Sequence, residues 1–222
     1  MPIEYLKQAT PPVQAIDTAT AETVRRLLAE IEAGGEVRVK ELARDFDGWH
    51  GDIVVDAATF ARAEKSLSDG VKADLKFARD RVQDFARRQR DSMHEFQAEL
   101  LPGLIAGQRL IPCNTAGCYV PGGRFPLPSS LLMTAVPARV AGVRDVIAVC
   151  PKPEPAVMAA ALEAGVTRLF RIGGAHAVAA LAYGTSTVPR VDKIVGPGNR
   201  YVAAAKARVS VDCAIDFYAG PT

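Results

Sequence analysis

From residue 145 onward, short apolar runs rich in valine and isoleucine alternate with runs rich in alanine. The apolar runs are continuously hydrophobic, which is typical of strands that are buried on both faces of a sheet. The alanine-rich runs between them have the pattern of crossover helices. We therefore predict an α/β fold with an incomplete Rossmann-like, mostly parallel, doubly wound sheet. The predicted strands lie within DVIAVC (145–150), VTRLFRIGG (166–174), DKIVGPG (192–198) and CAIDFY (213–218).

The first half of the chain follows a helical pattern instead. Apolar residues recur at helical spacing over residues 20–33, and a second helix is predicted over 37–47, with glycines at 34, 35 and 48 ending the two. Residues 51–56 fit either a short strand or an extended link. A long amphipathic helix is predicted from residue 69 to about residue 96. Its apolar stripe consists of Val71, Leu75, Ala78, Val82, Phe85 and Ala86.

The balance of basic and acidic residues differs between these two regions. Residues 1–110 hold 16 Lys and Arg against 19 Asp and Glu, whereas residues 111–222 hold 11 against 6. We therefore predict a helical N-terminal region over 1–110 and a Rossmann-like domain over 111–222. Because the sequence stops one turn after its last predicted strand, we expect the domain to be truncated at its C-terminal end and the chain to be part of something longer.

Composition excludes several classes of protein. A chain that is 49% hydrophobic and 23% charged is too apolar for intrinsic disorder, and its net charge of +2 gives no reason to expect nucleic acid. It contains no apolar run of membrane-spanning length and does not begin with a secretory signal, so no membrane association is expected. The four cysteines form no Cys-x-x-Cys pair and lie far from the histidines. We expect a cytoplasmic protein with reduced cysteines.

Three glycine-marked turns are the candidate ligand-binding elements. They span residues 117–124, 172–176 and 195–200, and the last two follow predicted strands and open predicted helices. Such turns let a phosphate or carboxylate approach bare backbone, although each one alone is more typical of a tight structural turn. None matches the G-x-G-x-x-G dinucleotide pattern. Their succession favours a cleft for an anion or a nucleotide.

Individual residues in these turns allow two interpretations each. Tyr119 either stacks on a base or covers the sheet edge. Asn199 is first a helix N-cap and only second a specificity group. His176 lies in a first helical turn, where the helix dipole favours the uncharged imidazole, and it either binds a ligand or is structural. Arg124 and Arg200 either meet an anion or are solvated.

Four segments stand out in order along the chain: GCYVPGGRFPLPSSLLMTAVPARVAGV (117–143), RIGGAHAVAALAYGT (171–185), VDKIVGPGNRYVAAAKARV (191–209) and AGPT (219–222). Taken together, they resemble the histidinol dehydrogenase family. The implied protein is an intertwined homodimer that uses zinc and NAD to oxidise an alcohol through the aldehyde to a carboxylate, as in the conversion of L-histidinol to L-histidine in histidine biosynthesis. The sequence of the first half is closer to a paralogous branch that includes sulfopropanediol dehydrogenase. A sulfonated or other small diol is therefore left open as the substrate. A non-catalytic nucleotide-binding or scaffolding fragment is a further alternative.

The resemblance also implies roles for single residues. Tyr119 and Asn199 fall on NAD-contacting positions, and His176 falls where the family usually has an NAD-contacting glutamine. Thr222 occupies the position of a substrate-contacting serine. The family's zinc ligands and catalytic Glu-His pair would follow Thr222, so we expect no catalytic residue and no metal ligand within these 222 residues, which alone should be inactive.

Overall fold

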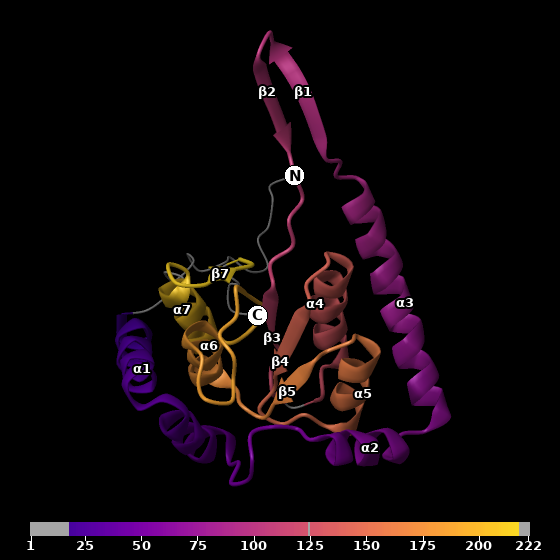
Figure 1. Cartoon of the computed structure of the whole chain (residues 1–222). Coiled ribbons are helices and arrows are strands. Elements are labelled where there is room, and N and C mark those ends of the chain that lie inside the picture. Colours follow the sequence, from indigo (N-terminus) through magenta and orange to yellow (C-terminus); the bar gives the residue numbers. More distant parts are fainter. Residues whose placement is uncertain (1–17, 124, 218–222) are drawn as a thin grey trace, which may run out of the picture.

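The computed structural model describes residues 18–123 and 125–217. A five-stranded, all-parallel sheet forms its centre, with the strand order β5-β4-β3-β6-β7, and a separate two-stranded antiparallel hairpin projects away from it (Figure 1). The predicted α/β fold with a mostly parallel sheet is therefore confirmed. The strands are β1 (Phe96–Leu101), β2 (Leu104–Gln108), β3 (Thr115–Tyr119), β4 (Asp145–Val149), β5 (Arg168–Phe170), β6 (Lys193–Val195) and β7 (Ala214–Ile215).

Helices cover both faces of the sheet. The helices are α1 (Thr18–Asp47), α2 (Ala57–Ser66), α3 (Asp69–Asp91), α4 (Pro128–Val140), α5 (Pro155–Glu163), α6 (Gly174–Tyr183) and α7 (Arg200–Val209). One face packs against α1, α6 and α7, and the other against α3, α4 and α5. Neighbouring residues of β4 point to opposite faces, because Ile147 belongs to the first core and Val146 and Ala148 to the second.

The central strand β3 is the part of the sheet that the sequence analysis did not predict as a strand. All of its residues before Tyr119 are small, and Gly117, which we assigned to a turn, lies inside it. A Cβ atom at Gly117 would come within 2.9 Å of Leu181 on α6. Glycine at this position therefore lets α6 pack closely on the centre of the sheet, and its role is packing rather than turn formation.

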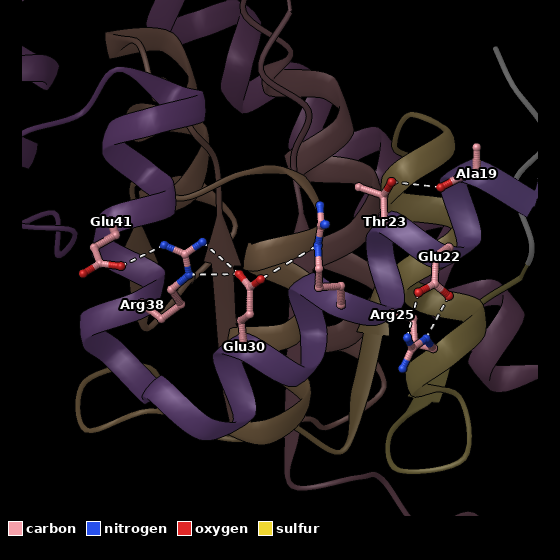
Figure 2. Close-up of polar contacts among 8 residues, drawn as sticks. Ala19, Glu22, Thr23, Arg25, Glu30, Arg38 and Glu41 are labelled. Carbon is pink, nitrogen blue, oxygen red and sulfur yellow. Dashed lines mark hydrogen bonds and ion pairs between the residues drawn. The ribbon is translucent and has the colours of Figure 1, made fainter.

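Helix α1 consists of two segments that meet at a kink. Gly35 has φ 55° and ψ −139°, which lies outside the helical region, and this confirms the predicted break. The guanidinium of Arg38 in the second segment donates to Glu30 in the first at 2.8 and 3.1 Å, and to Glu41 at 2.8 Å (Figure 2). The ion pair between Arg38 and Glu30 thus spans the kink.

The link between α1 and α2 lies along the edge of the sheet. Val54 forms an isolated antiparallel bridge with Phe170 of β5, and the Val55 amide donates to the Leu169 carbonyl at 2.9 Å. The segment is thus an extended link that pairs with β5 over a very short length. Because α1 and the link both contact the sheet region, the helices before residue 110 share its hydrophobic cores.

Helix α3 confirms the predicted long helix, but it ends at Asp91 rather than near residue 96, and not all of its predicted apolar stripe is buried. Leu75 and Ala86 are buried, with Ala78 and Val82 packed against the same core. Phe85, however, is 64% exposed. The helix contacts α4 and α5 over a narrower strip than the sequence pattern predicts.

Beyond α3, the chain forms the hairpin of β1 and β2, which the sequence analysis did not predict. Every residue of both strands is exposed, including the apolar side chains of Phe96, Leu101, Leu104 and Ile105. The turn of the hairpin uses Gly103 at φ 80°. No helix in the described part of the chain is both long and apolar enough to cross a membrane.

Candidate functional site

The candidate site lies where the connections of the sheet change direction. From β3 the chain proceeds through β4 to β5 on one side, and β6 and β7 lie on the other side of β3. Ligands of open α/β sheets bind beyond the carboxyl ends of the strands at such a switch point. A cavity of about 430 Å³ lies here, bounded by all three predicted glycine turns through Gly122, Gly174 and Asn199, and by α1. The structure therefore brings Tyr119, His176 and Asn199 together in one cavity.

Tyr119 is the last residue of β3, and its side chain reaches the start of α6. Its hydroxyl oxygen accepts a hydrogen bond of 3.0 Å from the Gly174 amide. The side chain is nearly buried, and burial raises the pKa of Tyr119 to about 12. The hydroxyl therefore keeps its proton at neutral pH and retains one hydrogen bond to donate.

His176 lies in the first turn of α6, as predicted, and is 1% exposed. Its Nε2 lies 2.9 Å from Oδ2 of Asp47, the last residue of α1. The same Oδ2 accepts a hydrogen bond of 3.0 Å from the Gly173 amide. Gly173 is the N-cap of α6 and has no side chain to cap the helix, so Asp47 supplies the capping carboxylate from a distant part of the sequence.

Asn199 is the N-cap of α7, as predicted. Its Oδ1 accepts hydrogen bonds from the amides of Tyr201 and Val202 at 3.0 and 3.1 Å. Since Oδ1 caps the helix, the side-chain NH₂ group is the part of Asn199 left to bind a ligand.

The turn that carries Asn199 is held by a buried ion pair. Lys206 of α7, 2% exposed, donates to the Gly196 carbonyl at 3.0 Å and pairs with Asp216, whose carboxylate accepts from the Gly196 amide at 2.8 Å. Gly196 has φ 118°, and a Cβ atom there would come within 2.2 Å of the Tyr119 carbonyl oxygen. Glycine is therefore required at this position, which fixes the turn against the end of β3.

The remaining predicted residues lie elsewhere. Arg200 does not line the cavity; its guanidinium lies 5.1 Å from the ring centroid of Tyr201, which does. Arg124 and Thr222 lie outside the described residues.

Asp47 and the other cavity residues of α1 were missed by sequence reasoning. Val24 and Leu27 have the helical spacing of ordinary core residues, and Phe46 and Asp47 precede a helix-ending glycine without any motif. Nothing local marks Asp47, because its partners follow it by more than a hundred residues. Only the packing of α1 on α6 brings them together.

A larger groove of about 700 Å³ lies on the α4 side of the sheet. It is lined mainly by apolar residues, including Met133, Pro137 and Val143, and contains none of the predicted site residues. Size alone therefore does not locate the site, since the smaller cavity holds the convergent polar groups.

Among the residues that the structure describes, no group of three or more His, Cys, Asp or Glu side chains is placed to hold a metal ion. All three of the buried cysteines have raised thiol pKa values because of burial: about 12 for Cys118, and about 11 for Cys150 and Cys213. These thiols stay protonated at neutral pH and are poor metal ligands and poor nucleophiles.

The sequence and the fold of this chain are similar to those of known proteins. The family model for histidinol dehydrogenase matches residues 12–222. A histidinol dehydrogenase homolog of Ruegeria pomeroyi is 42% identical over 100% of this chain and 52% of its own length. The sulfopropanediol 3-dehydrogenase of the same organism is 39% identical over 100% of the chain and 52% of its length, and the histidinol dehydrogenase of Thermus thermophilus is 46% identical over 94% and 50%.

A solved structure supports the same assignment. The histidinol dehydrogenase of Elizabethkingia anophelis superposes with a TM-score of 0.87 at 29% identity, covering 95% of this chain and 50% of that one. The chain spans about half the length of the relatives that it matches. The chain belongs to the histidinol dehydrogenase family.

Proposed function

We propose that this chain carries the dinucleotide-binding part of an NAD-dependent alcohol dehydrogenase and that NAD binds in the cavity around Tyr119, His176 and Asn199. NAD, when bound, supplies the hydride acceptor for oxidation of the alcohol. The volume of the cavity lies within the range of about 300–1,000 Å³ that is usual for small-molecule sites. Membership of the histidinol dehydrogenase family supports an oxidoreductase.

One observation carries the proposal: each of the three residues uses one polar atom within the protein and leaves another for a ligand. Tyr119 accepts from Gly174 and keeps its O–H, and Asn199 caps α7 and keeps its NH₂ group. His176 places Nε2 against Asp47 and keeps Nδ1. Converging polar groups that each keep one donor or acceptor for a ligand, in a cavity with apolar lining, suit a nucleotide with hydroxyl, amide and ring groups.

The proposed substrate is a small alcohol, which is oxidised through the aldehyde to a carboxylate. L-Histidinol is the first candidate, because several relatives are named histidinol dehydrogenase. A sulfonated diol is the second, favoured by the 39% identity with a sulfopropanediol 3-dehydrogenase over the whole chain. The proposal assigns zinc, which the resemblance implies, to no described residue, because no suitable group of ligands is present there.

Titration of the chain with NAD in a calorimeter tests the cofactor proposal. Tyr119→Phe keeps the ring but removes the hydroxyl, so the affinity for NAD should fall on the order of ten-fold. Tyr183→Phe, at the far end of α6 and outside the cavity, is the matched control and should bind NAD like the wild type. Equal binding by the wild type and Tyr119→Phe, or no binding by the wild type, would contradict the proposal.

A substrate panel tests the choice of alcohol. L-Histidinol, a sulfonated propanediol and the corresponding plain diol are offered, with NAD and zinc, to the protein purified from its native source. Preference for histidinol supports the first candidate, and preference for the sulfonated diol over the plain diol supports the second.

We also propose that the protein is a homodimer. The exposed apolar side chains of the β1–β2 hairpin support this, because an isolated two-stranded hairpin is at best marginally stable in water. Light scattering after gel filtration should give twice the monomer mass, and Leu104→Lys should shift the protein towards the monomer. A monomeric wild type would refute the proposal.

A further inference from the structure

Asp47 connects two elements that lie far apart in the sequence, at the edge of the proposed NAD cavity. Two donors converge on its Oδ2: the Gly173 amide at 3.0 Å and Nε2 of His176 at 2.9 Å. The side chains of Asp47 and His176 are 10% and 1% exposed. Water therefore competes little with either contact.

This contact determines which imidazole nitrogen carries the proton. A carboxylate only accepts hydrogen bonds, so Nε2 must be the protonated nitrogen. The negative charge of Asp47 is partly balanced by the N-terminus of α6, because Asp47 accepts a hydrogen bond from the Gly173 amide there. In the neutral ring, this arrangement places the lone pair at Nδ1.

The Nδ1 atom of the imidazole lies beside Gly174, and both residues line the cavity. Within residues 18–123 and 125–217, Nδ1 has no hydrogen-bond partner. A Cβ atom at Gly174 would come within 3.3 Å of Nδ1, and Gly174 itself lines the cavity. Because this residue is glycine, the space beside Nδ1 is left free for a ligand atom.

We propose that Asp47 is a positioning residue that fixes the Nε2–H tautomer of His176, so that Nδ1 accepts a hydrogen bond from an N–H or O–H group of the bound dinucleotide. This inference rests on the proposed function. It goes beyond the NAD-contacting role expected for His176 because it specifies the ligand group as a donor. A glutamine at this position presents both a donor and an acceptor, whereas this histidine presents an acceptor only.

Nitrogen NMR of the chain, labelled with ¹⁵N-histidine, tests the proposal directly. The chain has only three histidines, so His176→Gln assigns the signals. At slightly alkaline pH the His176 signals should be those of a neutral ring protonated at Nε2. Saturating NAD should move the Nδ1 signal in the direction of an accepted hydrogen bond while the ring stays neutral. An imidazolium, or a ring protonated at Nδ1, would overturn the proposal.

Variants of Asp47 supply the second readout. Asp47→Ala should give a mixture of tautomers and weaken NAD binding on the order of ten-fold. Asp47→Asn should keep the tautomer and bind NAD within about three-fold of the wild type, since one amide oxygen can accept both hydrogen bonds. Asp45→Ala, exposed on the same helix and outside the cavity, is the matched control. NAD binding by Asp47→Ala at wild-type strength would refute the positioning role.

The two proposals fail in different ways. If Asp47→Ala does not fold, as judged by circular dichroism, Asp47→Asn and the NMR of the wild type still decide the tautomer. If the wild type does not bind NAD, the proposed function fails, and so does the proposed hydrogen bond from the dinucleotide to Nδ1. The NMR spectrum of the free chain then still tests whether Asp47 fixes the tautomer of His176. If NAD binds and the Nδ1 signal does not move, only the present inference is wrong.

Discussion

Replacing Asn199 by aspartate should separate the stability of α7 from the binding of NAD. The Asn199 side chain accepts hydrogen bonds from two amides at 3.0 and 3.1 Å, and a carboxylate oxygen can accept the same two. A negative charge at a helix N-terminus is favourable by about 0.3–1 kcal/mol, so Asn199→Asp should be at least as stable as the wild type. Asn199→Ala removes the cap and should cost about 1 kcal/mol. For a chain of this size, that lowers Tm by roughly 2–4 °C.

The affinity for NAD should respond to these substitutions differently from the stability of the chain. Asn199→Asp replaces the NH₂ donor by a charged oxygen at the edge of the cavity, so NAD affinity should fall on the order of ten-fold or more in Asp and Ala variants alike. Urea denaturation measures stability, and calorimetric titration measures binding. Asn114→Asp, exposed before the start of β3, is the control and should bind NAD normally. If Asn199→Asp is as destabilised as Asn199→Ala, or binds NAD as the wild type does, the assigned orientation of the amide is refuted.

Three further predictions concern the fold. Gly196→Ala should lower the free energy of unfolding, measured in urea, by at least about 2 kcal/mol. The reason is that the alanine would have a positive φ and that its Cβ would lie within 2.2 Å of the Tyr119 carbonyl oxygen. A loss below about 0.5 kcal/mol would contradict this. Burial raises the pKa of Glu36, but hydrogen bonds from Lys40, Ser186 and Thr187 outweigh it and lower that pKa from 4.5 to about 2. The carboxylate therefore contributes stability above about pH 4.5 that is lost as pH falls towards 2, and Glu36→Gln should flatten this part of a stability–pH curve. A thiol reagent should label the partly exposed Cys113 well before the three buried cysteines, and fast labelling of two or more thiols would contradict the described burial.

The elements that could be predicted from sequence are those with a local cause. The run at 146–149 belongs to an inner strand because it is apolar throughout, and Asn199 caps α7 because a helix start favours a short acceptor side chain. Gly35 breaks α1 because its backbone conformation suits a residue without Cβ. Each of these properties depends on neighbours within a few residues.

The parts that were missed depend on distant contacts. Strand β3 consists mostly of small residues, and the approach of Leu181 explains the glycine at position 117. Phe85 follows the helical period of a core residue, yet the strip of α3 that contacts α4 and α5 is too narrow to cover it. Asp47 joins the site through residues 126 and 129 positions later, a distance at which no sequence pattern operates.

Mapping of NAD on the labelled chain tests the central claim most directly. Backbone amide signals are followed by NMR during titration with NAD. The account predicts that the largest changes cluster at Gly122, Gly174 and Asn199, with Val24 of α1 affected through the same cavity. Changes centred instead on the larger groove, at Met133 and Val143, or no changes at all, would contradict the claim that the NAD site lies at the switch point of the sheet.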